Sequence, residues 1–221
     1  MEELDQMRET LCQVGKLLYD RGYCAANDGN LSVRVGDRLL ITPSGVSKGR
    51  MTPDMLLVTD LEGRVLSGDR HPSSEGKLHC IIYLRRPDVS AVVPAHPPVS
   101  TAFAVCRRGL TEPWLAELVS GLGEVPVTEG FAMPSTDQVP RSIEPFLADH
   151  NAVLLANHGA VAWGEDLWSA FDRLETVEHT AKILLNARLL GGGVPLTAAE
   201  TAELKALRGF YKEQRGKREN V

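Results

Sequence analysis

The chain has 221 residues, 43% of them hydrophobic, and a formal net charge of −5 with a pI of about 5.7. This acidic balance argues against a nucleic-acid-binding function, and we expect the basic cluster near the C-terminus to be a flexible tail over residues 212–221. No apolar run has the length of a membrane span, and the acidic N-terminus is unlike a targeting peptide. Four scattered cysteines without a C-x-x-C pair indicate reduced thiols. We therefore expect a cytoplasmic protein with a single domain over residues 1–221 and neither a membrane nor a nucleic-acid partner.

The first half of the chain alternates helical and extended patterns. Apolar residues recur at helical spacing from Leu4 to Leu18, which predicts an N-terminal helix that ends at Gly22. Tight turns at Gly36 and Gly63 join two predicted pairs of strands, at residues 31–35 with 38–41 and at residues 55–59 with 64–66. A helix is predicted over residues 74–85, and a short buried strand over residues 91–93, which Pro94 should cut.

The second half ends in a long helix. Residues 135–138 and 197–200 fit the capping-box pattern of helix starts. Buried strands are predicted at residues 152–156 and 160–163, and a helix from about Leu167 to Leu190. Because tight turns join several strands, we predict one α/β domain with a mostly antiparallel sheet.

Three polar residues on the long helix imitate a carboxylate metal motif: Glu175, Glu178 and His179. Known helical sites of that kind contain two copies of the motif, and this sequence contains one. We therefore predict that these side chains form a solvated helix face.

Three turns are rich in hydroxyl or amide groups. Residues 27–30 read Asn-Asp-Gly-Asn, residues 42–45 read Thr-Pro-Ser-Gly, and residues 72–75 read Pro-Ser-Ser-Glu. Turns of this composition expose backbone amides, and a helix start adds a dipole that favours phosphate. Each turn alone is more often a structural loop or a helix cap, so the functional interpretation depends on all three occurring together.

Two histidines follow predicted buried strands. His96 precedes a Pro-Pro pair, which makes its position rigid, and His158 precedes Gly159, which permits close approach of a ligand. A lone loop histidine is usually a polar side chain with one hydrogen bond, but two at matching strand ends favour a metal site. Glu75 is a candidate acid/base group, and His79, four residues later on the same helix, is placed to orient it.

Six segments, in this order, resemble the class II aldolase/adducin family, in its fuculose-1-phosphate aldolase and ribulose-5-phosphate 4-epimerase branch. They are Gly-Asn-Leu-Ser-Val-Arg at 29–34, Ile-Thr-Pro-Ser-Gly at 41–45, Pro-Ser-Ser-Glu at 72–75, Arg-Pro-Asp-Val at 86–89 before Ala-Val-Val at 91–93, His-Pro-Pro at 96–98, and Leu-Leu-Ala-Asn-His-Gly at 154–159. The resemblance covers roughly residues 5–212. It implies a central, mainly antiparallel sheet flanked by helices, and a homotetramer with active sites between subunits.

The resemblance also implies roles for individual residues. A zinc-type divalent ion would be held by the residue at position 94, His96 and His158, and Glu75 would be the acid/base group. The phosphate of a sugar phosphate would be bound by Asn27, Asn30, Ser44, Gly45, Ser73 and Ser74. Epimerases of this family carry Asp where this chain has Glu75.

The sequence departs from the family at Pro94, which stands where the first ligand of a His-x-His segment is expected. Proline has no ligand atom in its side chain. Either Glu75 completes a site with His96 and His158, a ligand set known for zinc, or the metal is held weakly.

A second departure concerns the aldehyde end of the substrate. Gly130 or Phe131 falls where the aldolase has a tyrosine. Tyr211 roughly matches a tail tyrosine that acts in the neighbouring subunit's site, and a packing role suits it about equally well.

The function expected from these features is that of a class II aldolase. It would cleave a short ketose 1-phosphate, such as fuculose 1-phosphate, to dihydroxyacetone phosphate and an aldehyde, with the ion polarising the carbonyl. The alternatives are a sugar-phosphate 4-epimerase, a 3-oxo-tetronate-phosphate decarboxylase, and a catalytically impaired adducin-like module, the last because of Pro94.

Overall fold

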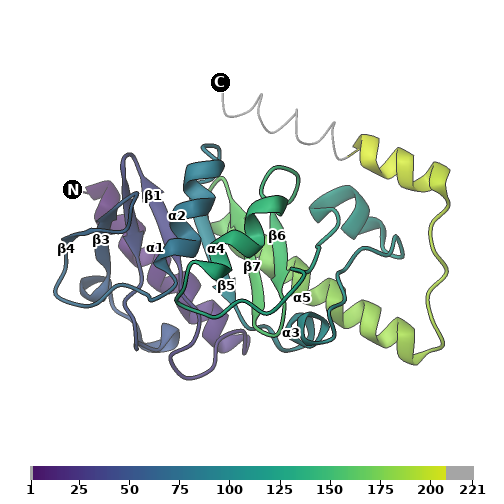
Figure 1. Cartoon of the computed structure of the whole chain (residues 1–221), viewed down its shortest axis with the longest axis horizontal. Helices are drawn as coiled ribbons and strands as arrows, with labels where there is room; N and C mark the ends of the chain where they lie inside the picture. The colour runs from purple at the N-terminus through teal and green to yellow at the C-terminus, as the bar shows by residue number, and fades with distance from the viewer. Residues whose placement is uncertain (1, 208–221) are drawn as a thin grey trace.

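A seven-stranded sheet forms the centre of the computed structural model, which describes residues 2–207 (Figure 1). The strand order is β4-β3-β2-β1-β5-β7-β6, and each pair of neighbours is antiparallel. The strands are β1 (Ser32–Val35), β2 (Arg38–Ile41), β3 (Leu57–Asp60), β4 (Val65–Ser67), β5 (Ala91–Ala95), β6 (Ala152–Leu155) and β7 (Gly159–Gly164). The predicted fold, an α/β domain with a central antiparallel sheet, is confirmed.

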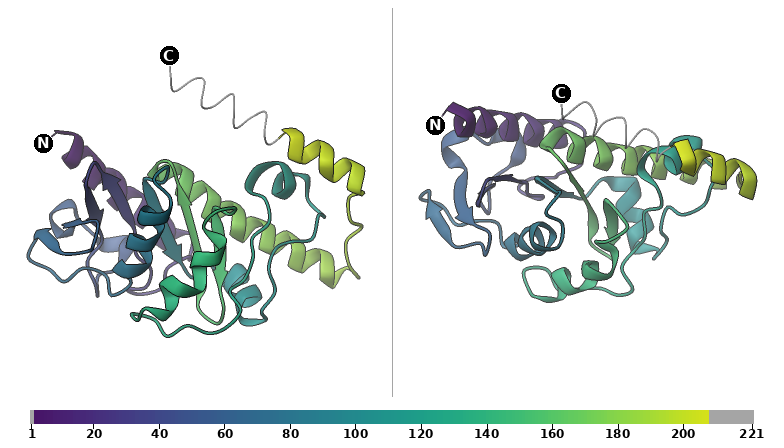
Figure 2. Two further views of the ribbon diagram at one scale, coloured as in Figure 1. Left: turned by 45° about the horizontal axis from the view of Figure 1, so that its top comes forward. Right: turned by 90° about the horizontal axis from the view of Figure 1, so that it is seen from above.

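Helices cover both faces of this sheet, as the view from above shows (Figure 2). One face packs against α1 (Glu2–Asp20), α3 (Pro98–Val105) and α5 (Leu167–Leu189). The other packs against α2 (Gly76–Arg85) and α4 (Gln138–Ile143). Alternation along β5 sends Val93 and Ala95 into the first layer and Val92 into the second, as the pleat of a strand requires. In the described part of the chain, no helix is long and apolar enough to cross a membrane.

The predicted elements correspond closely to the observed ones. The N-terminal helix, both strand pairs, the two late strands and the long helix all occur, with ends shifted by two residues or fewer. The capping box at residues 197–200 is confirmed, because the Glu200 amide donates to Thr197 Oγ1 at 3.2 Å and the Thr197 amide donates to Glu200 Oε2 at 2.7 Å. Residues 135–138 do lead into a helix, α4, but the capping pattern there is wrong: Thr136 Oγ1, not Ser135, accepts from the Gln138 amide. Helix α3 and the single helical turn at Leu118–Leu122 were not predicted.

Pro94 does not cut its strand, contrary to the prediction. Strand β5 continues to Ala95, and Pro94 pairs with Val161 of β7. The Pro94 carbonyl accepts from the Asn30 amide at 3.4 Å, so its backbone faces away from β7. Pairing of β1 with β5 ends at Val92, and the missing N–H of Pro94 therefore breaks no ladder hydrogen bond.

The prediction of a solvated face is also wrong for Glu178. Its side chain is fully buried and accepts from the amides of Val99 at 3.2 Å and Ser100 at 2.8 Å, at the start of α3. A carboxylate there satisfies free helix amides and complements the helix dipole. His179 is exposed and Glu175 pairs with Arg21, whereas the buried Glu178 holds α3 against α5.

Candidate functional site

Two of the three predicted turns are joined directly to one another. Pro43 and Pro72 form an antiparallel bridge, the Ser44 amide donates to the His71 carbonyl at 2.9 Å, and the Ser73 amide donates to the Thr42 carbonyl at 3.2 Å. The segment after β2 and the segment before α2 therefore lie side by side. This brings the hydroxyls of Ser44 and Ser73 to one rim, although many residues separate them in the chain.

The third turn approaches them because of a glycine. Gly29 has φ of 72°, and a Cβ there would lie 2.4 Å from Cys24 Sγ. Both the backbone conformation and the contact exclude a larger residue. The chain can therefore pass close to β5 before β1 begins, where the Asn30 amide meets the Pro94 carbonyl.

Glu75 stands at the N-cap position of α2 and is largely buried, with 12% of its side chain exposed. Asn30 Nδ2 donates to Oε2 at 2.9 Å, and His158 Nε2 lies 3.4 Å from Oε1. Oε1 is buried and has no hydrogen-bond partner in the described structure. One carboxylate oxygen thus accepts a hydrogen bond from the protein, and the other has only the His158 imidazole near it.

His96 and His158 face each other from the ends of β5 and β6, with ring centroids 5.3 Å apart. Gly159 makes this approach possible, because a Cβ there would lie 2.5 Å from the Ala95 carbonyl oxygen and 2.9 Å from His96 Cδ2. Burial lowers the pKa of His96, and the neighbouring His158 lowers it further, against the opposing effects of Asp28 and Glu75. A lowered pKa favours the neutral imidazole, which is the form that binds a metal.

One cavity of about 290 Å³ collects these groups. Its lining residues are Asn27, Asp28, Gly29, Asn30, Pro43, Ser44, Gly45, Ser73, Ser74, Glu75, His96, Pro134, Ser135 and His158. The list contains every predicted phosphate-contacting residue, the predicted acid/base residue and both histidines. Asp28 and Ser135 line it without having been predicted, and Tyr211 lies outside the described residues.

The donor atoms in this cavity suit a divalent cation. Three residues that line it each carry a buried polar atom without a hydrogen-bond partner in the described structure: Glu75 Oε1, His96 Nδ1 and His158 Nδ1. Two imidazoles and a carboxylate are ligands that zinc accepts. Within residues 2–207, however, no three His, Cys, Asp or Glu side chains are already grouped as a metal site.

Position 94 is where the family resemblance predicts a third ligand. Pro94 lies on the strand that leads to His96, two residues away, and so on the same face of the sheet. It contributes no ligand atom, and it is absent from the cavity lining. Phe131 is half exposed and lies outside the cavity lining, and no tyrosine is among the lining residues.

Lys48 is a residue that the sequence interpretation missed. It is 1% exposed, and its Nζ donates to the carbonyls of Val46 at 2.5 Å and Asn27 at 3.4 Å. It thereby connects the segment after Gly45 to the Asn27 turn. Burial lowers the pKa of this ammonium, while Cys24 and Asp28 raise it. The available sequence signal was only a lysine three residues after a glycine turn.

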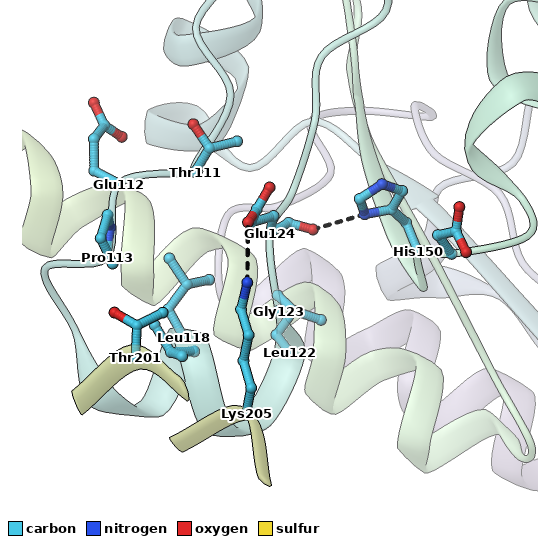
Figure 3. Close-up of a pocket in the computed structure, with 12 residues that line it drawn as sticks. Thr111, Glu112, Pro113, Leu118, Leu122, Gly123, Glu124, His150, Thr201 and Lys205 are labelled. Atoms are coloured by element: carbon cyan, nitrogen blue, oxygen red, sulfur yellow. Dashed lines mark hydrogen bonds and ion pairs between the residues drawn. The ribbon is translucent and has the colours of Figure 1, made fainter. Parts of the chain in front are cut away.

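A second cavity, of about 300 Å³, lies beside the helix at residues 198–207 (Figure 3). In it Lys205 Nζ lies 3.8 Å from a carboxylate oxygen of Glu124, and His150 Nδ1 donates to the Glu124 carbonyl at 3.0 Å. None of the predicted site residues that the structure describes lines this cavity. We therefore assign the chemistry to the cavity around Glu75.

We predict that Lys48→Met weakens phosphate binding by roughly 10-fold, about 1.4 kcal/mol. The substitution removes a buried positive charge and the hydrogen bonds from Nζ to the carbonyls of Val46 and Asn27, which join the two turns. The matched control is Arg50→Met, which removes the same charge from an exposed position on the short 3₁₀ helix Lys48–Arg50 that also contains Lys48. Calorimetric titration with dihydroxyacetone phosphate would measure both. Equal losses in the two variants would mean that only net charge matters.

Comparisons with known proteins agree with this geometry. Residues 9–185 match the family described as Class II Aldolase and Adducin N-terminal domain. A 3-oxo-tetronate 4-phosphate decarboxylase of Haemophilus influenzae is 37% identical, over 83% of this chain and 88% of its own length. An L-fuculose phosphate aldolase of Methanocaldococcus jannaschii is 30% identical, over 80% of this chain and 95% of its own. The solved structure of an L-fuculose 1-phosphate aldolase has a TM-score of 0.83 at 32% identity, covering 90% of this chain and 94% of the other. The chain belongs to the class II aldolase/adducin family.

Proposed function

We propose that this protein is a lyase that cleaves a carbon–carbon bond near the carbonyl group of a small phosphorylated substrate. The observation that carries the proposal is the composition of one cavity: three polar turns, a buried carboxylate with one unpartnered oxygen, and two facing imidazoles. An anion, a polarised carbonyl and a mobile proton each have a suitable partner there.

The turns would hold the phosphate. Ser44, Ser73 and Ser74 present hydroxyls to the cavity, and Gly45, with φ of 70°, gives its turn an exposed backbone. The start of α2 adds a positive dipole end, and Lys48 places a cation behind two of the turns. Phosphate held at this end would orient the reacting carbons by binding energy that comes from outside the reaction centre.

His96 and His158, with Glu75 Oε1 as a third donor, would hold a divalent ion, for which zinc is our proposal. When bound, such an ion supplies Lewis-acid polarisation of the substrate carbonyl. The two histidines follow the buried strands β5 and β6, which hold them in place.

Glu75 would move the proton at the reacting carbon. Asn30 fixes Oε2, which leaves Oε1 as the oxygen that can hold or deliver a proton. If Glu75 also served as a permanent ligand, its capacity as an acid or base would be reduced. The two roles therefore compete, and Pro94 is the reason that they do.

Between specific reactions, we favour decarboxylation of a 3-oxo-tetronate 4-phosphate. Loss of carbon dioxide from C1 leaves an electron pair that is delocalised as an enediolate over C2 and C3, and protonation at C2 gives dihydroxyacetone phosphate. Support comes from the Haemophilus influenzae relative, and from Gly130 and Phe131, which provide no tyrosine for an aldehyde.

Retro-aldol cleavage of a ketose 1-phosphate is the second candidate. It leaves the same enediolate after the bond between C3 and C4 breaks, so the phosphate, carbonyl and proton sites are shared. The similarity to fuculose phosphate aldolases in sequence and fold favours it. Assays of carbon dioxide release and of aldehyde release on the two substrates would separate the candidates, and epimerisation of a pentulose phosphate would be followed in parallel.

We also propose a cytoplasmic homotetramer with sites between subunits. Two apolar side chains at the end of α5 are exposed, Leu189 at 76% and Leu190 at 88%. They form an apolar surface that the chain could bury on assembly. Light scattering at micromolar concentration should show four chains per particle, and a monodisperse monomer would contradict the proposal.

We predict that Glu75→Gln lowers turnover by roughly 10²–10⁴-fold and leaves phosphate binding nearly intact. Glutamine keeps the size of glutamate but cannot take up a proton at neutral pH. Steady-state kinetics and calorimetric titration with dihydroxyacetone phosphate measure the two effects. Glu62→Gln, an exposed change of the same kind, is the control. Unchanged turnover in Glu75→Gln would rule out the proposed proton transfer.

Restoring the missing imidazole should increase metal retention. We expect Pro94→His to raise zinc affinity by at least roughly 10–100-fold, since a direct bond contributes more than a supporting contact. Metal content after dialysis against a mild chelator measures this, and Leu84→His adds a histidine at an exposed control position. Full and equal occupancy in all three chains would show that Glu75 already replaces the ligand. A chain without metal or turnover that gains both in Pro94→His would instead be an impaired, adducin-like member.

A further inference from the structure

A continuous series of buried hydrogen bonds connects Glu75 to strand β1. Asn30 Nδ2 donates to Glu75 Oε2 at 2.9 Å, and Asn30 Oδ1 lies 2.5 Å from His79 Nε2. His79 Nδ1 lies 2.6 Å from Ser32 Oγ, which lies 2.7 Å from the Tyr83 hydroxyl. The four residues beyond Glu75 are each 5% exposed or less. We define this set, Asn30, His79, Ser32 and Tyr83, as the relay.

Each hydrogen bond in the relay needs one donor and one acceptor, so the choice of hydrogens at Glu75 decides the choice at every later residue. An ionised Glu75 only accepts, so Asn30 turns its NH₂ group toward it and its carbonyl oxygen toward His79. His79 must then carry its hydrogen on Nε2 and accept at Nδ1 from the Ser32 hydroxyl. Because the Ser32 hydroxyl donates to His79, the Tyr83 hydroxyl supplies the hydrogen between the two side chains: it donates to Ser32 Oγ at 2.7 Å and shares that hydrogen with the Ser32 carbonyl oxygen at 3.0 Å, which ties the relay to the β1 backbone.

Burial supports this assignment of hydrogens. His79 is fully buried in α2, and desolvation lowers its pKa to about 3. The ring is therefore neutral at physiological pH, and a neutral imidazole has one donor and one acceptor. A protonated ring would donate from both nitrogens and would lose its acceptor for Ser32.

We propose that His79 is a positioning residue for Glu75 and acts through the side-chain amide of Asn30. His79 Nε2–H fixes the orientation of that amide, the amide donates to Oε2, and Oε1 is left as the single oxygen available to the substrate. If the amide were reversed, its carbonyl oxygen would face the carboxylate, and Glu75 would turn away or take up a proton. The inference rests on the proposed function, because it assigns Glu75 the acid/base role.

Turnover by variants at position 79 gives the first test. His79→Leu should lower kcat roughly 10- to 100-fold, as expected if the unfixed Asn30 amide no longer holds its hydrogen bond to the Glu75 carboxylate. KM should stay within about threefold, because Ser44, Ser73 and Ser74 are untouched. His79→Gln keeps a donor at the Nε2 position and should restore most of kcat. Ile82→Val, a buried change on the same helix, controls for packing. Equal losses in His79→Gln and His79→Leu would overturn the inference.

A double-mutant cycle tests the route through Asn30. If His79 acts only through that amide, His79→Leu should have almost no further effect on kcat in an Asn30→Ala background. Losses that add fully would mean that His79 acts on the fold or on another group, and the inference would fail.

The third readout does not need catalysis. Imidazole ¹⁵N NMR of the histidine-labelled full chain should show His79 as the Nε2–H tautomer, uncharged from pH 8 to pH 5. A Nδ1–H tautomer, or protonation near the ordinary histidine range, would overturn the inference. If the tautomer is as expected but none of the tested substrates reacts, the proposed function has failed and the orientation of Asn30 stands.

Discussion

The burial of the Glu75 carboxylate is the constraint on which the rest of the site depends. Removing an ionised carboxylate from water costs several kcal/mol or more unless hydrogen bonds or opposite charges replace its hydration. Here Asn30 supplies one hydrogen bond to Oε2, while Oε1 has only His158 near it, at 3.4 Å. This incomplete compensation is what a proton-transfer or cation-binding role requires, because a fully satisfied carboxylate has no oxygen left to act.

Close backbone approach is the second requirement, and glycines meet it. Gly29 lets its turn pass Cys24, and Gly159 lets His158 reach His96 across the end of β5. Around them, buried groups hold the segments in place: Lys48 joins two turns, and Glu178 caps the helix that follows His96. The cavity is thus positioned by side chains that do not line it, which makes its geometry sensitive to changes far from the substrate.

Pro94 matters for the chemistry of the site but not for the fold. The strand tolerates proline because the missing N–H faces a region where β1 has already ended. Pro94 pairs with Val161 inside the sheet, and the two histidines and the carboxylate share one cavity, so a proline at the position of the expected ligand is compatible with the frame of the site. A chain with this substitution can therefore keep the family fold while its metal affinity, and with it the balance between the two roles of Glu75, differs.

Helical and strand periodicity, the glycine turns and the ordered family segments were enough to predict the fold class, the element order and the residues that now share one cavity. These signals are local, or they rest on resemblance, so they can be read from the sequence. The partners of the buried polar groups could not be read in this way. Asn30 meets Glu75 across 45 positions, and Glu178 meets Ser100 across 78, and no periodicity records such pairs. The sequence thus determined which residues enter the site, whereas packing of the sheet against α2 and α5 decided which polar atoms are satisfied and which remain free, since that depends on contacts made only when the chain has folded.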